Sequence, residues 1–170
     1  EEKLWTLLPQ LPDLQSAWLL LLNCAAPRSN YRSRTVAPQY NGKYAKGHDE
    51  GLWATLCALL GKHLLEGPQG RSAAQVATLP LRKGGLGLRS AVRTRPAVFW
   101  ASWADTLPMM AARCPDLAGK VLEALEKGAT SEAECLRQAS ATKEVLGSEG
   151  FECPSWREVH NGLRPLEPPQ

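Results

Sequence analysis

The acidic side chains of this sequence do not form the clusters that metal-dependent nucleotidyl transfer requires. That chemistry needs carboxylates placed to hold two metal ions about 4 Å apart. No D-x-D, D-D or E-x-x-D cluster lies where a strand could end. Asp49 and Glu50 form the only adjacent pair in mid-chain, and we expect them to open a helix, where acids interact favourably with the helix dipole. The sequence therefore predicts that this chain is not itself an enzyme.

Histidine and cysteine are no better placed for catalysis or metal binding. His48, His63 and His160 have no partnered nucleophile, and His63 is expected to pack in the core. The five cysteines are odd in number, widely spaced and without a C-x-x-C pair, so we expect no zinc site and reduced thiols. Reduced thiols are typical of an intracellular protein, nuclear or cytoplasmic. The Leu19–Leu22 run is too short to span a bilayer, so no membrane partner is expected.

A glycine-rich segment has some features of a phosphate-binding loop. A Walker loop needs G-x-x-x-x-G-K-[ST], and a dinucleotide-binding turn needs G-x-G-x-x-G between a strand and a helix. Gly84, Gly85 and Gly87 satisfy neither pattern, so we interpret the segment as a structural turn held to the core by its leucines. A secondary role stays open, in which the glycines, the helix start at Ser90 and three basic neighbours hold a backbone phosphate. These neighbours are Arg82, Lys83 and Arg89.

Positive charge is concentrated in the first part of the chain. Residues 1–115 hold 14 Lys/Arg against 7 Asp/Glu, whereas residues 116–170 hold 6 against 10. Two windows contain basic residues and no acid, which suits a polyanionic partner because each neutralised phosphate releases counterions. An ordinary solvated surface is the alternative. The first window holds Arg28, Arg32, Arg34, Lys43 and Lys46, and the second holds Arg71, Arg82, Lys83, Arg89, Arg93 and Arg95.

Aromatic side chains offer two further candidates for contact with nucleic acid. Tyr31 lies among the arginines of the first window, in a segment expected to be a polar loop, and could stack on a base. Trp100 and Trp103 are one helical turn apart and share a face. If exposed, they too could stack on bases. We expect them instead to form a core ridge, with the small side chains between them letting another helix approach.

Hydrophobic spacing and capping residues predict an all-α fold, an irregular bundle of about seven or eight helices. Helices are expected over residues 14–25, 48–65 and 72–79, and then from a cap at Ser90 to Pro96, which must break or kink the helix and most simply restarts it. Further helices are expected over 96–107, from 116 to 128 after an Asp116 cap, from 131 to about 147, and briefly after 155. Residues 27–43 are rich in Pro, Asn, Ser and Gly and are expected to form an ordered loop.

Capping patterns and composition divide the chain further. Asp13 is expected to cap the first helix, and the pairs Ser131–Glu134 and Ser155–Glu158 have capping-box spacing. We predict a basic helical region over 1–115, an acidic helical extension packed on it over 116–161, and a disordered tail over 162–170.

The order of motifs resembles the post-palm region, thumb and connector, of non-LTR retrotransposon reverse transcriptases, in particular those of protists and algae. The most specific part of the likeness is the Leu-Pro…Gly-Gly-Leu-Gly-Leu element. The matching segments are Leu22-Asn23-Cys24, Pro27-Arg28, Tyr31, Arg34-Thr35, Pro38, Ala45, Asp49, Leu60-Gly61, the run from Leu79 to Ser90, the run from Phe99 to Asp105, Pro154-Ser155-Trp156 and Arg164-Pro165.

This resemblance implies a helical fragment of a longer RNA-directed DNA polymerase. The fragment would cradle the primer–template duplex and contact the palm of the same polypeptide. The catalytic aspartates and their Mg²⁺ ions would lie upstream, so no cofactor and no small-molecule ligand are expected in this chain. Backbone contacts are expected from Arg28, Arg32 and Arg34 on one strand and from Arg82, Lys83, Arg89 and Arg93 on another stretch. The alternative is a helical protein-interaction or structural domain, from a decayed or exapted element, that does not bind nucleic acid.

Overall fold

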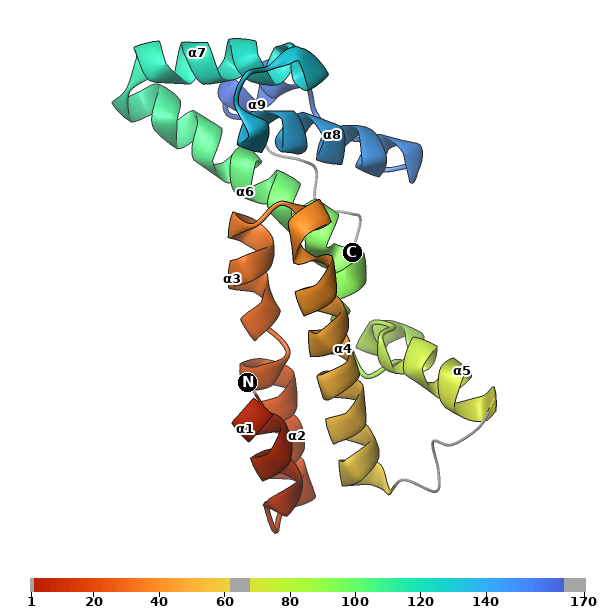
Figure 1. Cartoon of the computed structure of the whole chain (residues 1–170). Helices are drawn as coiled ribbons and strands as arrows, with labels where there is room; N and C mark the ends of the chain where they lie inside the picture. The colour runs from red at the N-terminus through yellow and green to blue at the C-terminus, as the bar shows by residue number, and fades with distance from the viewer. Residues whose placement is uncertain (1, 62–67, 164–170) are drawn as a thin grey trace. The chain divides into compact units, whose positions relative to one another are not determined.

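The structure, a computed structural model, describes residues 2–61 and 68–163, and within those ranges it contains helices and turns but no strand (Figure 1). The predicted all-α fold is confirmed. No helix in the described ranges has both the length and the apolar character that crossing a membrane requires. The α-helices are α1 (Glu2–Leu7), α2 (Leu14–Leu20), α3 (Arg28–Thr35), α4 (Pro38–Leu60), α5 (Pro68–Ala77), α6 (Ala91–Arg113), α7 (Pro115–Glu126), α8 (Glu134–Ser148) and α9 (Trp156–His160).

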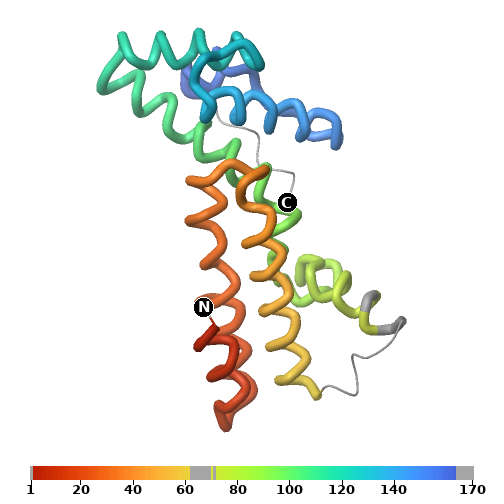
Figure 2. Tube along the Cα trace, in the orientation of Figure 1, coloured from red at the N-terminus to blue at the C-terminus, as the bar shows by residue number. Residues whose placement is uncertain are grey.

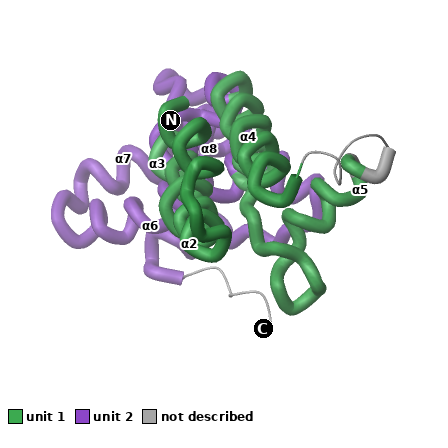
Figure 3. The backbone as a smooth tube through the Cα atoms, turned by 90° about the horizontal axis from the view of Figure 1, so that it is seen from below, with its two compact units in different colours: residues 1–32, 42–94 green, residues 33–41, 95–170 purple. Residues whose placement is uncertain are grey.

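The chain folds into two compact units (Figure 3). Unit 1 comprises residues 1–32 and 42–94, and unit 2 comprises residues 33–41 and 95–170. The boundary after residue 32 lies inside α3, the boundary after residue 41 lies inside α4, and the boundary after residue 94 lies inside α6. The boundary at residue 115 that charge predicts coincides with none of them, because the units follow packing and not composition.

The core of unit 1 joins α2 and the π-helical turn after it to α4. Leu21 and Ala25 come from that turn, and Leu52 and Leu56 come from α4. Leu88, from the extended segment before α6, completes the same buried cluster. On α4 the two leucines are four residues apart, so they lie on one helix face, as the apolar spacing predicts.

The core of unit 2 is built around two tryptophans. Trp100 of α6 and Trp156 at the start of α9 are both buried, and their ring centroids lie 6.3 Å apart. Leu107 of α6, Leu125 of α7 and Leu146 of α8 pack into the same cluster. Helix α7 lies against both α8 and α9, so the C-terminal helices close over the indoles.

The expected loop over residues 27–43 is wrong, because this segment forms α3 and the first turns of α4 (Figure 2). Three small polar residues of this segment, Ser29, Ser33 and Asn41, are buried. Ser29 Oγ donates to the carbonyl of Ala26, and Asn41 Nδ2 donates to Ser33 Oγ at 3.2 Å. Pro38 occupies the first position of α4, where its missing N–H costs nothing. Tertiary burial therefore overrides the low helix propensity of this composition.

The expected break at Pro96 is also wrong. Helix α6 runs from Ala91 to Arg113 with both Pro96 and Pro108 inside it. A proline in a helix interior removes one backbone hydrogen bond and costs about 3 kcal/mol or more. The helix is anchored on both sides of Pro96, by the capped residues at its start and by the buried side chains of Phe99 and Trp100 after it. These contacts offset the lost bond.

Two of the predicted caps are confirmed. Asp13 accepts a hydrogen bond of 2.8 Å from the Ser16 amide at the start of α2. Hydrogen bonding to the side chain and the amide of Ser16 holds the pKa of Asp13 below its ordinary value. Ser155 and Glu158 form a reciprocal capping box at α9, which lowers the pKa of Glu158 in the same way. Both pairs lie within one helical turn, so local spacing was enough to identify them.

Two other expected caps are wrong. Helix α7 begins at Pro115, so Asp116 lies in its first turn and does not cap it. Helix α8 begins at Glu134, and the hydroxyl of Ser131 has no hydrogen-bond partner among the described residues. The carboxylate of Glu134 is instead hydrogen-bonded to Arg137 and to neighbouring amide and phenol groups, which lower its pKa.

Three further sequence-based expectations concern the bounds of helices and of the C-terminal tail. The helix expected from residue 48 already begins at Pro38, and its predicted end near 65, together with His63, lies outside the described residues. The helix expected over 72–79 corresponds to α5, which begins earlier, at Pro68. Of the tail expected over 162–170, residues 164–170 lie outside the described residues.

Candidate nucleic-acid interface

The basic face of α3 carries three of the predicted contact residues. Arg28, Tyr31 and Arg32 are spaced i, i+3 and i+4, so they share one face of the helix, and all three side chains are exposed. The guanidinium carbon of Arg32 lies 4.6 Å from the ring centre of Tyr44 on α4, a cation–π contact that orients the arginine. Tyr31 is 78% exposed. This face presents two guanidinium groups and a phenol ring within one helical turn.

Arg34 does not belong to that face. It lies in unit 2, where its guanidinium donates to Asp105 Oδ2 at 2.8 Å. Its carbonyl accepts a hydrogen bond of 2.8 Å from Ser102 Oγ. Both side chains of the ion pair are largely exposed, so the pair contributes little to stability, but it matches the arginine with a negative charge. Arg28, Arg32 and Arg34, grouped by sequence, are therefore divided between the two units.

The glycine segment forms the structural turn that the sequence predicts. Gly84 and Gly87 have φ values of 77° and 69°, in the left-handed region that glycine tolerates best. Gly85 is buried, and a Cβ atom placed on it would lie 2.1 Å from the carbonyl oxygen of Leu79. A side chain at position 85 would therefore force the backbone apart.

The backbone amides of this turn are already used within the turn. The Gly84 amide donates to Leu81, the Gly85 amide to Pro80 and the Gly87 amide to Leu79, at 3.0, 3.2 and 2.8 Å. Phosphate loops work because several amides point at the ligand with no other acceptor. The three glycine amides are therefore not free to take part in the suggested phosphate site.

The start of α6 is capped from a distance by α4. The carboxylate of Asp49 accepts hydrogen bonds from Ser90 Oγ at 2.6 Å, from the Ala91 amide at 2.7 Å and from the Val92 amide at 3.2 Å. Ser90 caps the helix as predicted, since its hydroxyl also accepts from the Arg93 amide at 3.2 Å. Asp49 was expected to open a helix, yet it lies in the middle of α4 and serves the end of another helix.

The electrostatics of this cap depend on Asp49 being ionised. Burial alone would raise the pKa of Asp49. The neighbouring His48 ring, whose Nδ1 lies 3.7 Å from Asp49 Oδ1, and the hydrogen bonds donated by Ser90 and by the two amides at the start of α6 outweigh burial and hold the pKa of Asp49 below its ordinary value. The carboxylate thus places a negative charge at the positive end of the α6 dipole. A phosphate at the same place would meet this charge, so the α6 N-terminus does not supply the suggested phosphate site.

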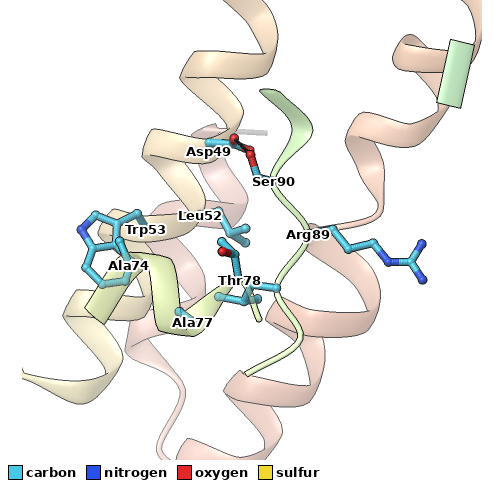
Figure 4. A pocket seen from close by; sticks show the side chains of 9 residues that line it. Asp49, Leu52, Trp53, Ala74, Ala77, Thr78, Arg89 and Ser90 are labelled. Atoms are coloured by element: carbon cyan, nitrogen blue, oxygen red, sulfur yellow. Dashed lines mark hydrogen bonds between the residues drawn. The ribbon is translucent and has the colours of Figure 1, made fainter. Parts of the chain in front are cut away.

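Four basic side chains remain available around the turn. Arg82 and Lys83 lie in a short 3₁₀ turn before the glycines, and Arg89 and Arg93 lie on either side of Ser90. All four are exposed. Figure 4 shows the guanidinium of Arg89 pointing outward from the extended segment. An anion that binds to this part of unit 1 would therefore contact these side chains and not backbone amides.

The tryptophans of α6 form the expected core ridge. Trp100 is 5% exposed, and Trp103 packs against the same core. Trp100 therefore presents no free face on which a base could stack, whereas Trp103 is only partly buried and lines a hollow of unit 2. His48 is buried as well, with Nε2 3.4 Å from the carbonyl oxygen of Ala25 and its ring edge against Trp5. Sequence reasoning did not identify His48 as a core residue.

No group of three or more His, Cys, Asp or Glu side chains in residues 2–61 and 68–163 is placed to hold a metal ion. Comparison of the chain with protein families, with characterised proteins and with solved structures found no match.

Proposed function

We propose that this chain is a helical module of a retroelement reverse transcriptase that carries no catalytic residues and binds the sugar–phosphate backbone of primer–template nucleic acid. The proposal rests on the resemblance of its motifs to the post-palm region of such enzymes and on one structural observation, the gathering of positive charge in unit 1. Unit 1 holds 11 Lys/Arg against 6 Asp/Glu, whereas unit 2 holds 9 against 11. A duplex would therefore contact unit 1.

The contacts fall into two groups within that unit. Arg28 and Arg32 on the exposed face of α3 form one group, beside Tyr31. The second group surrounds the glycine turn and consists of Arg82, Lys83, Arg89 and Arg93. The stretch from residue 67 to residue 104 contains no Asp or Glu, so no acid of that stretch screens the second group. Because these are flexible cations and not amide groups aimed at base edges, binding should be independent of sequence.

The experiment that tests the proposal is fluorescence anisotropy of the whole chain with a labelled RNA–DNA hybrid, at low and at physiological salt. The variant Arg28→Ala/Arg32→Ala should weaken binding and lower the slope of log affinity against log salt by about 2, about one unit for each phosphate contact removed. The double variant Arg34→Ala/Arg113→Ala, in unit 2, also removes two positive charges and serves as the matched control.

The outcomes separate the possibilities cleanly. Binding that falls steeply with salt, and falls further in the α3 double variant than in the unit 2 double variant, supports the proposal. Equal losses in the two double variants would mean that net charge alone drives binding. Absence of binding at low salt, by a chain whose circular dichroism is helical, would refute the proposal for this chain. If the chain binds, competition between the RNA–DNA hybrid and duplex DNA shows which of the two it prefers.

A second candidate function is favoured by the apolar surface of the first helices. Leu7, Leu14 and Leu19 are each about half exposed, and Leu11 and Leu20, in the same stretch of the chain, are partly exposed. Apolar side chains grouped on a surface are typical of protein–protein interfaces. A helical interaction domain that does not bind nucleic acid is therefore the alternative. Failure of hybrid binding together with concentration-dependent association in analytical ultracentrifugation would favour it.

A further inference from the structure

A small apolar pocket opens in unit 1 between α4, α5 and the extended segment before α6 (Figure 4). Its volume is about 140 Å³. Leu52 and Trp53 line it from α4, Ala74 and Ala77 from α5, and Leu88 from the extended segment. The two alanines leave the space open, because larger side chains at these positions would fill it. An apolar cavity of about 150 Å³ in another protein holds a benzene molecule, so this pocket has room for one bulky apolar side chain.

The pocket continues into a wider hollow along α5. The hollow has a volume of about 710 Å³ and shares Ala74, Thr78 and Ser90 with the pocket. Val76 and Leu79 line it, and they are 48% and 36% exposed. We call the pocket and the hollow together the α5 groove. Its apolar lining is open to solvent, as expected of a surface that takes a partner.

The polar groups in the wall of the pocket are already paired. Asp49 accepts three hydrogen bonds, Ser90 Oγ both donates and accepts one, and Thr78 Oγ1 donates to the carbonyl of Gln75 at 2.8 Å. A nucleobase inserted here would leave its hydrogen-bonding edge without partners among these groups, which is costly in an apolar site. The pocket therefore suits an aliphatic or aromatic side chain better than a base.

The charge beside the groove indicates the charge of the segment that would bind there. Arg93 lines the wider hollow. Arg89 borders the pocket, but its guanidinium points away from the other lining side chains (Figure 4), so the positive charge of the groove comes mainly from Arg93. No Asp or Glu occurs between residues 67 and 104, and the carboxylate of Asp49 is occupied by the α6 cap. A segment that places carboxylates next to these arginines would be complementary in charge.

We infer that the α5 groove docks an acidic segment of another protein that inserts one bulky apolar side chain, of the Phe or Leu type, into the pocket. This site is separate from the exposed α3 face, but it shares Arg89 and Arg93 with the second basic group of the proposed function. Its apolar anchor does not depend on nucleic-acid binding, and the peptide test contains no nucleic acid. The apolar anchor supplies most of the affinity, because it is the group that leaves water completely. The arginines orient the segment and set its on-rate.

The test uses the whole chain and three short synthetic peptides built from Glu and Ala. The first has one central Phe, the second has Ala at that place, and the third keeps the Phe but replaces Glu with Lys. Measured by fluorescence anisotropy, the Glu–Phe peptide should bind at least about 10-fold more tightly than the Ala peptide, the gain expected from burying a Phe side chain. The Lys peptide should bind more weakly than the Glu–Phe peptide.

Matched variants locate the site. Ala74→Leu fills the pocket and should reduce binding of the Glu–Phe peptide to that of the Ala peptide. Ala73→Leu adds the same side chain to the next position of α5, which lines neither cavity, and should leave binding unchanged. Arg93→Glu should reverse the preference between the Glu–Phe and Lys peptides, whereas Arg113→Glu in unit 2 should not.

A measurement without substitutions guards against misfolded variants. Titration with benzene, followed by NMR of the isotope-labelled wild-type chain, should shift the amide signals of Ala77 and Leu88, which line the pocket. Absence of these shifts, equal affinity for the Phe and Ala peptides, or unchanged binding by Ala74→Leu would each overturn the inference. Loss of RNA–DNA binding in Ala74→Leu would overturn it too, by assigning the groove to nucleic acid.

Discussion

Removing the carboxylate of Asp49 should destabilise unit 1 more than any nearby surface substitution. Three hydrogen bonds converge on this group, and its side chain is 23% exposed, so water replaces them only in part. Hydrogen bonds to a charged group are worth about 1.5–3 kcal/mol, and loss of a helix N-cap costs about 0.5–2 kcal/mol. Since these contributions overlap, we expect Asp49→Ala to lower the free energy of unfolding by about 2–4 kcal/mol.

The assay is urea unfolding followed by far-UV circular dichroism at neutral pH, with Glu50→Gln as the matched control. Glu50 is the next residue on α4, is largely exposed and makes only a 3.8 Å contact with Lys46. Its removal should change the midpoint little. Asp49→Asn keeps one acceptor oxygen and should fall between the wild type and Asp49→Ala. Equal midpoints for Asp49→Ala and Glu50→Gln would refute the remote cap.

The same group predicts a dependence of stability on pH. Because the folded-state pKa of Asp49 lies below its ordinary value of 3.8, its contribution is fully present above that value and is lost as the pH falls through the folded pKa. Stability of the wild type should therefore fall below about pH 4. The difference between the wild type and Asp49→Asn should shrink over the same range. A difference that stays constant down to acid unfolding would contradict an ionised cap.

Three further predictions concern packing and thiol chemistry. Gly85→Ala should strongly destabilise the chain, since the new Cβ atom would lie 2.1 Å from a backbone oxygen. Gly47→Ala, which has open space around it in α4, should instead stabilise the chain by about 0.5–1 kcal/mol. Thermal unfolding of the two variants tests both expectations. Trp100→Ala should cost about 3–5 kcal/mol in urea unfolding because it empties the centre of the unit 2 core, and a loss below about 1 kcal/mol would mean that this core collapses around the gap. Burial raises the pKa of the Cys57 thiol. Alkylation at neutral pH, followed by mass spectrometry, should therefore modify the exposed Cys24 before Cys57. Modification of Cys57 before Cys24 would contradict the packing of α4.

Features that depend on one helical turn could be predicted from the residues alone. The caps at Asp13 and at Ser155 with Glu158 were found by their three-residue spacing. The indole ridge of α6 followed from two tryptophans three residues apart. The all-α fold followed from apolar spacing near 3.6 residues. In each case the residues that interact lie within one or two helical turns of each other, so residues that are close in the sequence are also close in space.

Part of the candidate site was predicted for a similar reason. Glycines at 84 and 87 are needed because their φ values are positive, a requirement of the backbone that is visible in the residue type. The sequence left a phosphate-holding role of this turn open, because the acceptors of its glycine amides depend on how the chain reverses after Leu79. The grouping of Arg34 with Arg28 and Arg32 failed because helix geometry points residues two positions apart to different faces.

Contacts between distant segments could not be read from local patterns. Asp49 and Ser90 are 41 residues apart, and each has an ordinary local role, one in mid-helix and one at a helix start. The helical state of residues 28–43 and the continuation of α6 through Pro96 also depend on what packs against them. Composition and periodicity determine which helices can form and which residues are charged. Where those helices begin and end, and which charges are already paired, is settled by burial, because an unpaired polar group is tolerated in water and is costly in the core.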